Sequence, residues 1–263
     1  MVTQMVDSAE IHDVTDLPVT GVAIDYPSGH IVEPHSHSRS QLLYAIEGVL
    51  VIETPAGRWV TPPSRGVWLQ AGTEHSLRMQ GAARVRSLFV DPYAIPGLPG
   101  SDCVIAISPL LRELILAATQ IVECYASDSR DGRLMRLLLD ELCTLPILPF
   151  HLPWPSDERI ARVCRVLSEQ PAINIGANEW AQQLAMSPKT FHRRFLIGTG
   201  VTFGRWRQQA RLLRSLEYLA RGESVLEVAL QHGYNSQSAF AAAFKRQFGV
   251  PPTVFYQSLE PAE

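Results

Sequence analysis

The chain has 263 residues, of which 46% are hydrophobic and 19% are charged, a composition that excludes a disordered protein. Its net charge of −3 is unevenly distributed: residues 1–155 carry 10 Lys/Arg against 17 Asp/Glu, a net of −7, and residues 156–263 carry 13 against 9, a net of +4. A basic segment joined to an acidic one suggests that only the C-terminal half meets a polyanion.

The cysteines and the apolar runs limit the compartment. Cys103, Cys124, Cys143 and Cys164 stand far apart without a C-x-x-C spacing, which predicts reduced, mostly buried thiols and neither a disulfide framework nor a zinc site. No apolar run reaches the roughly 18 residues of a membrane span, and no signal peptide is evident. We therefore expect a cytoplasmic protein with no membrane partner.

Residues 1–93 have the pattern of an all-β domain. The segments Gln41–Ile52 and Arg58–Leu69 are rich in Val, Leu, Tyr and Trp, and turn residues such as Ala71-Gly72-Thr73 surround them. Several short strands at regular spacing predict a barrel or a sandwich.

Residues 94–145 are predicted to form a connector, Ala94–Cys103, followed by two helices, Pro109–Tyr125 and Arg133–Leu145. Their leucines exceed what a small barrel must cover, which favours a homodimer formed through these helices; alternatively, the leucines only cover the barrel. The leucines concerned are Leu110, Leu114, Leu134, Leu137, Leu138 and Leu142. Four prolines within residues 146–155 exclude regular helix and place an interdomain linker at 146–156.

Residues 157–263 are predicted to be all-helical and contain an internal repeat at an offset of 49. Each copy has the pattern Ser-x-x-x-Phe-x-x-x-Phe-x-x-x-x-Gly-Val and begins at Ser187 or Ser236. The serine is a natural N-cap, and the two phenylalanines share one helical face. A further helix precedes each copy, at Asn178–Ala185 and Ser224–Gln231, the latter opening with a Ser-x-x-Glu capping box. Helix, turn and capped helix, twice, predict a double helix-turn-helix domain.

The exposed edge of the first capped helix is basic. Lys189, His192 and Arg193 lie at i, i+3 and i+4, opposite the phenylalanines, as suits a helix in the major groove. The connecting helix, about Phe203–Arg221, can direct Arg207, Arg211 and Arg214 outward, and the first two are expected to contact phosphates. For a single helix, the simpler interpretation is an ordinary solvated face; two copies in a basic domain favour DNA.

The segment Asn178–Tyr256 resembles the DNA-binding domain of the AraC/XylS family of transcription regulators. The resemblance is carried by residues 229–244, ALQHGYNSQSAFAAAF, and residues 248–252, FGVPP. It implies seven helices, with recognition helices near 188–198 and 237–247. The base contacts it implies fall at Lys189, His192 and Arg193 in the first unit and at Gln237, Ser238, Ala239, Ala241 and Ala242 in the second. Thr190 is also expected to be a DNA-binding residue. Because alanine can touch only thymine methyl groups, the second unit is expected to read few bases.

The N-terminal half resembles a cupin barrel, the effector domain of many AraC-type regulators, over Tyr26–Phe89. The pattern is Gly29-x5-His35-x-His37-x3-Gln41-x6-Gly48, followed by Gly72-x2-His75, and it departs from the cupin pattern in having Gln41 where Glu is usual. Further departures are Gln70 in place of Pro and Met79 in place of Asn. In metal-binding cupins the ligands would be His35, His37, Gln41 and His75.

Those four side chains could hold Zn, Ni, Co, Fe or Cu. The sequence does not decide what occupies this site. The alternatives are a divalent transition metal, an organic effector without metal, and no ligand at all, with His35 and His37 simply solvated. His35, His37 and Gln41 share one face of an unbroken strand, and only a closed barrel would bring His75 alongside.

The sequence thus predicts a sequence-specific transcription regulator controlled by a small molecule or metal, not an enzyme, and no catalytic residue is assigned. The alternative is a cupin metalloenzyme with an accessory DNA-binding domain. The expected partners are double-stranded DNA, the effector, a second copy of the chain and, for an activator, RNA polymerase.

Overall fold

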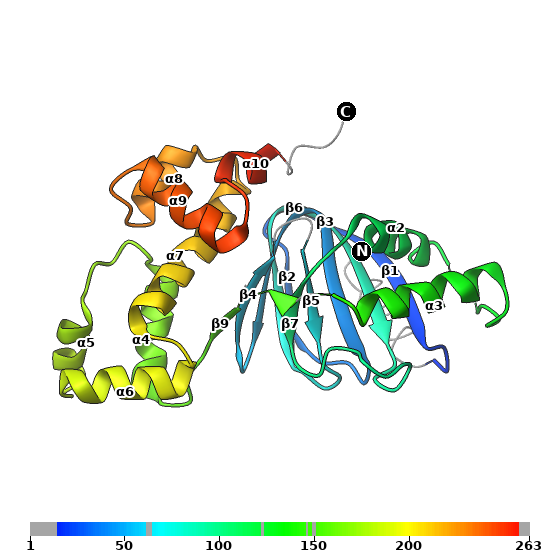
Figure 1. Ribbon diagram of the computed structural model, residues 1–263, viewed down its shortest axis with the longest axis horizontal. Coiled ribbons are helices and arrows are strands. Elements are labelled where there is room, and N and C mark those ends of the chain that lie inside the picture. The colour runs from blue at the N-terminus through cyan, green and yellow to red at the C-terminus, as the bar shows by residue number, and fades with distance from the viewer. Residues whose placement is uncertain (1–14, 62–64, 122–123, 146, 149–150, 258–263) are drawn as a thin grey trace. The chain divides into compact units, whose positions relative to one another are not determined.

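The computed structural model describes residues 15–61, 65–121, 124–145, 147–148 and 151–257. It divides into two compact units (Figure 1): one comprises residues 1–54 and 61–150, and the other comprises 55–60 and 151–263. The first is a sheet followed by helices and the second is mainly helical, which confirms the predicted fold class. Of the predicted linker, residues 146, 149 and 150 lie outside the described residues, as do residues 62–64 within the predicted strand segment Arg58–Leu69.

The first unit is built on an antiparallel sheet in the order β1-β6-β3-β5-β7-β8, with β2 also pairing with β6. These strands are β1 (Val19–Tyr26), β2 (Ile31–His35), β3 (Ser40–Thr54), β5 (Arg65–Leu69), β6 (His75–Val90), β7 (Cys103–Ala106) and β8 (Ile147–Leu148). Among the described strands no pairing joins β1 to β8, so the sheet is open, unlike the closed barrel that the cupin resemblance implies.

A bulge bends the two longest strands. The register between β3 and β6 shifts on both sides of Glu47, and Gly48 beside it has a φ of +82°. A Cβ atom at Gly48 would lie 2.5 Å from the carbonyl oxygen of Ala82, so only glycine fits there. Such a bulge increases the local twist, which lets 15-residue and 16-residue strands curl.

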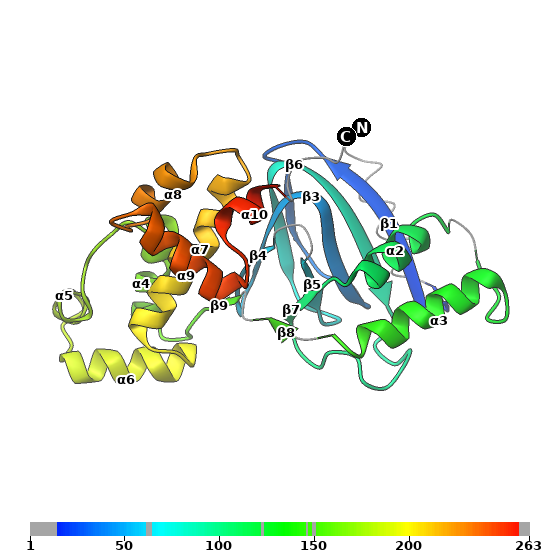
Figure 2. The same ribbon diagram turned by 45° about the horizontal axis from the view of Figure 1, so that its top comes forward.

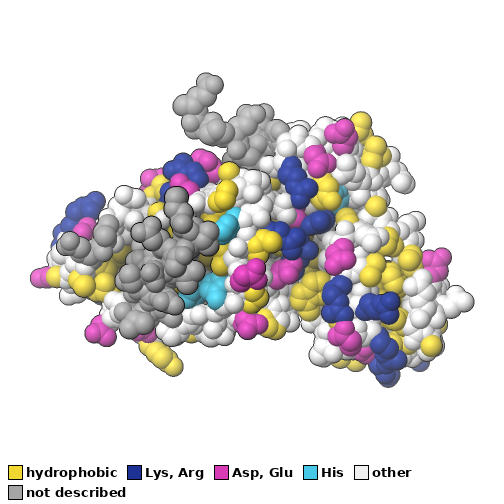
Figure 3. Space-filling view, turned by 180° about the vertical axis from the view of Figure 1, so that it is seen from behind, with side chains coloured by type: hydrophobic (Ala, Val, Ile, Leu, Met, Phe, Trp, Pro, Cys, Tyr) yellow, Lys and Arg dark blue, Asp and Glu magenta, His cyan; other side chains and the backbone are white. Residues whose placement is uncertain are grey.

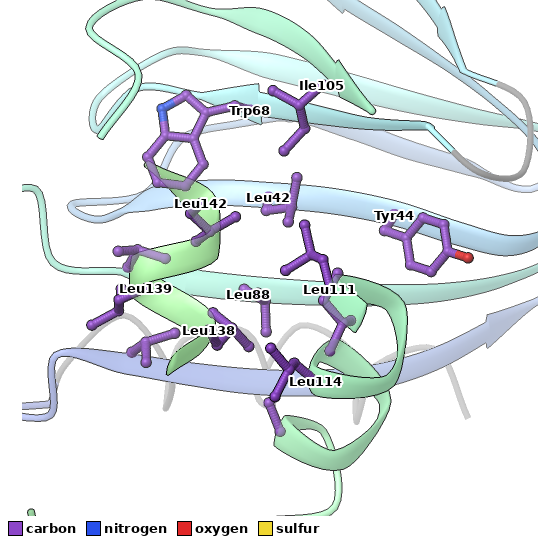
Figure 4. Packing of buried hydrophobic residues seen from close by; sticks show 14 of the residues in the cluster. Leu42, Tyr44, Trp68, Leu88, Ile105, Leu111, Leu114, Leu138, Leu139 and Leu142 are labelled. Carbon is purple, nitrogen blue, oxygen red and sulfur yellow. The ribbon is translucent and has the colours of Figure 1, made fainter. Parts of the chain in front are cut away.

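Two helices, α2 (Pro109–Ala118) and α3 (Arg130–Leu142), cover one face of this sheet (Figure 2). Their leucines pack against Leu42, Trp68 and Leu88 of the sheet, as Figure 4 shows. Leu114, Leu138 and Leu142 are therefore core residues that cover the sheet. Only Leu110 and Leu137 of the predicted dimer leucines stay exposed, at 48% and 44%.

Both of these helices differ in extent from the prediction. The first ends at Ala118 rather than Tyr125 because the chain turns at Thr119, and the second begins three residues before Arg133 because Ser129 caps it by accepting from the Gly132 N–H. The predicted strand Arg58–Leu69 is likewise two strands, β4 (Gly57–Thr61) and β5, on either side of residues 62–64.

The second unit contains seven helices within its described residues, the number that the AraC/XylS resemblance implies. They are α4 (Glu158–Glu169), α5 (Ala177–Gln183), α6 (Pro188–Thr199), α7 (Phe203–Leu219), α8 (Val225–Gln231), α9 (Gln237–Phe248) and α10 (Pro252–Gln257). A short antiparallel pair, β4 with β9 (His151–Pro153), completes the unit. No described helix combines the length and the apolar character that crossing a membrane requires.

Candidate nucleic-acid interface and three-histidine site

The two predicted recognition helices, α6 and α9, begin and end in the same way. The Ser187 hydroxyl accepts a hydrogen bond from the Thr190 N–H, and the Ser236 hydroxyl accepts one from the Ala239 N–H. Each helix ends at a glycine with positive φ, Gly200 or Gly249. The repeat read from the sequence is therefore a repeat of structure, with both helix starts fixed by side-chain caps.

The phenylalanines of the repeat form the inner face of each recognition helix. Phe191 and Phe195 are fully buried with ring centroids 5.7 Å apart, and Phe240 and Phe244 are fully buried with centroids 5.5 Å apart. Because the helix period places i and i+4 on one side, this packing turns the opposite edge of each helix outward. The fold thus presents the predicted reading edges to solvent.

The turns inside the two helix-turn-helix motifs differ by one residue. The Met186 N–H donates to the Ala181 carbonyl in the first, and the Tyr234 N–H donates to the Ala229 carbonyl in the second. These equivalent residues are 48 positions apart in the sequence, whereas the N-caps that follow, Ser187 and Ser236, are 49 apart. The left-handed position is Ala185, with a φ of +50°, in the first turn and Gly233, with a φ of +75°, in the second. The second turn therefore has one more residue than the first, between Tyr234 and Ser236. The offset of 49 found in the recognition helices did not reveal this difference.

The structure leaves the predicted base-contacting side chains accessible. On α6, Lys189, His192 and Arg193 are exposed and Thr190 is half-buried. On α9, most of the corresponding residues are exposed and only Ala241 is half-buried; the exposed ones are Gln237, Ser238, Ala239 and Ala242. The first edge carries cations and the second carries an amide, a hydroxyl and methyl groups.

The outward arginines expected on α7 are instead half-buried and bonded within the unit. Arg207 donates to the Ile175 carbonyl at 3.2 Å, and Arg214 forms an ion pair with Glu217. Arg211 donates to three carbonyl groups, at distances of 2.8 to 3.4 Å. The predicted outward orientation is wrong for Arg207 and Arg211, because loops distant in sequence supply acceptors that helical periodicity cannot reveal. Arg214 instead pairs with Glu217 of its own helix. On the face that Figure 3 draws, Lys and Arg side chains are interspersed with acidic ones.

In the first unit, His35, His37 and His75 come together, with one ring nitrogen of each within 4.8 Å of the others. His35 is directly opposite His75 in the pairing of β2 with β6, and the Gly72 N–H donates to the His37 carbonyl at 2.7 Å. The strand is not unbroken from 35 to 41, since β2 ends at His35 and β3 begins at Ser40. Adjacent strand ends, and not barrel closure, assemble the three-histidine site.

Hydrogen bonds fix how two of these imidazoles face the site. Nδ1 of His35 lies 2.8 Å from the Glu33 carbonyl oxygen, and Nδ1 of His75 lies 2.9 Å from that of Thr73. A carbonyl can only accept, so each Nδ1 carries the proton and each neutral ring keeps a lone pair on Nε2. This outer support is what metal-ligating histidines in proteins usually have.

Burial keeps His75 in the neutral form that binds metal. It is 2% exposed, and burial, together with the neighbouring His35 and His37, lowers its pKa to about 4. Its Nε2 is buried and has no hydrogen-bond partner among the described residues. Three imidazoles suit zinc, nickel, cobalt, iron or copper, so the residues present fit a divalent transition metal.

Gln41, the fourth predicted ligand, lies beside this cluster. It pairs with Phe89 across β3 and β6, and the Phe89 ring also packs edge-on against His37, with centroids 4.9 Å apart. Its amide nitrogen donates to the Ser87 hydroxyl at 3.4 Å, while its buried Oε1 has no hydrogen-bond partner among the described residues. An amide oxygen in that state can accept from a ligand or bind a metal.

Two supporting features escaped the sequence analysis. Asp102 accepts from the Gln70 N–H at 2.8 Å and from the Thr73 hydroxyl, which anchors the turn that carries His75. In the second unit, Arg58 of β4 donates to the fully buried Glu217 of α7 at 2.8 Å. Neither pairing leaves a local pattern, because the partners lie 29 or more residues apart.

Comparison with known proteins decides the family. A helix-turn-helix domain model matches residues 180–258. The HTH-type transcriptional regulator NimR of Escherichia coli is 34% identical over 218 residues, which covers 83% of this chain and 80% of NimR. The chain belongs to the AraC family of transcription regulators.

Other relatives of this AraC-family protein match a smaller part. RipA of Corynebacterium glutamicum, an HTH-type transcriptional regulator, is 30% identical over 131 residues, which covers 50% of this chain and 38% of RipA. Among solved structures, the DNA-binding domain of AdpA in complex with a target DNA is 30% identical, covers 38% of this chain and 91% of that one, and has a TM-score of 0.37. ToxT of Vibrio cholerae is 13% identical, covers 93% and 99%, and has a TM-score of 0.41.

The expected membership is thereby confirmed, and with it a DNA-binding regulator of transcription whose partner is double-stranded DNA. NimR and RipA are both named as transcriptional regulators and not as enzymes. The metalloenzyme alternative thus has no support among these relatives.

Proposed function

We propose that this AraC-family regulator reads DNA through α6 and α9 and that a metal or small molecule bound at the three-histidine site controls it. The observation that carries the first part is the pair of equally capped helices with buried phenylalanines behind them and accessible reading edges. Lys189, Thr190, His192 and Arg193 contact bases from α6. On α9 the base contacts are made by Gln237, Ser238, Ala239, Ala241 and Ala242.

Arg193→Ala is expected to weaken binding to the preferred DNA by about 5-fold to 150-fold, the loss of about 1–3 kcal/mol that follows removal of a bidentate contact to guanine. Binding to random DNA should weaken far less. Mobility shifts on a duplex selected from a random library measure both. The control is Arg162→Ala, which removes an exposed charge from α4 and should weaken binding to the preferred DNA and to random DNA equally. An Arg193→Ala protein with unchanged affinity for the selected duplex would refute the contact.

The controlling site is proposed from the chemistry of its donors. His35, His37 and His75 supply neutral imidazoles, and Gln41 adds an oxygen without charge, so a divalent metal held there keeps its full positive charge. Such a centre can bind an anionic effector directly. Control by an organic molecule alone is the other occupant that the same donors allow.

Untagged protein dialysed against Zn²⁺, Ni²⁺ or Co²⁺ is expected to retain about one metal per chain, and His75→Ala should retain almost none. His30→Ala is the matched control, since His30 lies in the same unit but outside the cluster. Elemental analysis checks this. Retention below about 0.1 metal per chain after soaking would reject the metal and leave the organic effector.

A homodimer is proposed through α2 and α3. Leu110 and Leu137 are the predicted dimer leucines that the sheet leaves exposed, and two large apolar side chains on these helices are available to a second copy. As an activator, the dimer would also contact RNA polymerase.

A further inference from the structure

One arginine of the long helix α7 contacts both the loop that leads into the first helix-turn-helix motif and the turn of the second motif. Arg211 Nε donates to the Pro171 carbonyl at 2.8 Å, and Nη2 donates to the Ile173 carbonyl at 3.4 Å. Both carbonyl groups belong to the loop that leads from α4 into α5, the first helix of the first motif. Nη1 donates to the carbonyl of Gly233, in the turn of the second motif, at 3.2 Å.

The turn of the second motif is shaped to this guanidinium group. A Cβ atom added at Gly233 would lie 2.8 Å from Nη2 of Arg211 and 2.9 Å from Cζ, closer than real Cβ atoms approach. Gly233 also has a φ of +75°, a conformation that favours glycine, and a Cβ atom there would force the guanidinium group of Arg211 to shift. Ala185, at the corresponding position of the first motif, also has a positive φ, of +50°, so the feature particular to Gly233 is its contact with Arg211.

The chemistry of the group explains why an arginine stands here. Guanidinium carries donors directed along a rigid planar fork, and three of its nitrogens each reach a different carbonyl. Lysine has one nitrogen and cannot hold three acceptors in this fixed arrangement. These bonds use three of the five N–H groups of Arg211 and hold the guanidinium group within the unit.

We propose that Arg211 is a positioning residue that fixes the two helix-turn-helix motifs relative to each other and thereby sets the half-site spacing at which the protein binds DNA. This inference rests on the proposed reading of DNA by both α6 and α9. Each added base pair moves the second half-site by about 3.4 Å and turns it around the duplex, so rigidly held motifs reject altered spacings. Motifs released from a shared anchor tolerate them.

The test uses the full-length protein and the duplex that it selects from a random library, together with duplexes lengthened or shortened by one base pair between the half-sites. Wild-type protein should prefer the selected spacing by about tenfold or more. Arg211→Lys, which keeps the charge but not the fork, should reduce that preference at least threefold. The slope of log affinity against log salt should stay the same, since no phosphate contact is lost. Arg205→Ala, which removes an exposed charge from the same helix, should keep the preference.

Gly233→Ala disturbs the same contact from the other side and should also reduce the preference for the selected spacing. This second variant tests the inference even if the Arg211→Lys protein fails to fold. The inference is overturned if both variants keep the wild-type spacing preference. It is overturned in favour of a phosphate contact if Arg211→Met lowers the salt slope by about one unit and leaves the spacing preference intact. A wild-type protein that shows no spacing preference overturns this inference alone, because loosely held motifs would behave in the same way. The proposed reading by both motifs fails separately, if base changes in one of the two half-sites leave the affinity unchanged.

Discussion

Replacing Glu217 with glutamine is expected to lower the free energy of unfolding of the second unit by about 3–5 kcal/mol. Glu217 is fully buried on α7, where its carboxylate accepts from Arg58 of β4 and from Arg214. Glutamine preserves the shape but removes the charge that compensates two guanidinium groups, one of them only 6% exposed. Leaving a cation buried with less compensation is among the most costly single changes in a protein.

Urea unfolding followed by far-ultraviolet circular dichroism measures this loss, because most helices belong to the second unit. Glu169→Gln, at an exposed position of α4, is the matched control and should change stability by no more than about 0.5 kcal/mol. Adding Arg58→Met to Glu217→Gln should restore part of the lost stability, since it removes one of the stranded charges. A loss below about 1 kcal/mol for Glu217→Gln would mean that water reaches the carboxylate.

Phe191→Ala and Phe240→Ala should each destabilise the second unit by about 3–5 kcal/mol, and by similar amounts. Both rings are fully buried; Phe191 packs against Phe195 and Phe203, and Phe240 packs against Phe244 and Tyr234, with centroids 5.3 to 5.7 Å apart. Each truncation removes the aromatic group that holds a recognition helix against its own motif.

The same urea experiment compares the two truncations. Ile197→Ala, at a 77% exposed position of α6, is the control and should be nearly neutral. If one truncation lowered the free energy of unfolding much more than the other, the two motifs would not be equivalently packed. The repeat in structure would then not be a repeat in stability.

Local signals in the second unit were sufficient to predict most of its helices. Ser187 followed by Pro188, and the capping box of Ser224 with Glu227, act within one helical turn, so their presence in the sequence translates directly into helix starts. The buried phenylalanines at i and i+4 are equally local. These features predicted the motifs before any long-range contact was known.

Features that depend on distant contacts could not be predicted in this way. Arg211 lies on the same helical stripe as Arg207 and Arg214, and only the approach of the 171–175 loop and the Gly233 turn draws it inward. The three histidines were grouped correctly but for a different reason, because the pairing of His35 with His75 on neighbouring strands leaves no signature in spacing. Likewise, the sheet stays open although the residue pattern resembled a barrel.

The central claim is that both recognition helices read the same DNA site. Hydroxyl-radical footprinting of the purified protein on its selected duplex tests this most directly. The account predicts two protected segments on one face of the duplex, about 10–10.5 base pairs apart, with base changes in the half-site read by α6 weakening binding more than those in the half-site read by α9. Arg193→Ala should lose protection first at the α6 half-site. A single protected segment would contradict the central claim, whereas equal penalties in both half-sites would contradict only the expected weaker reading by α9.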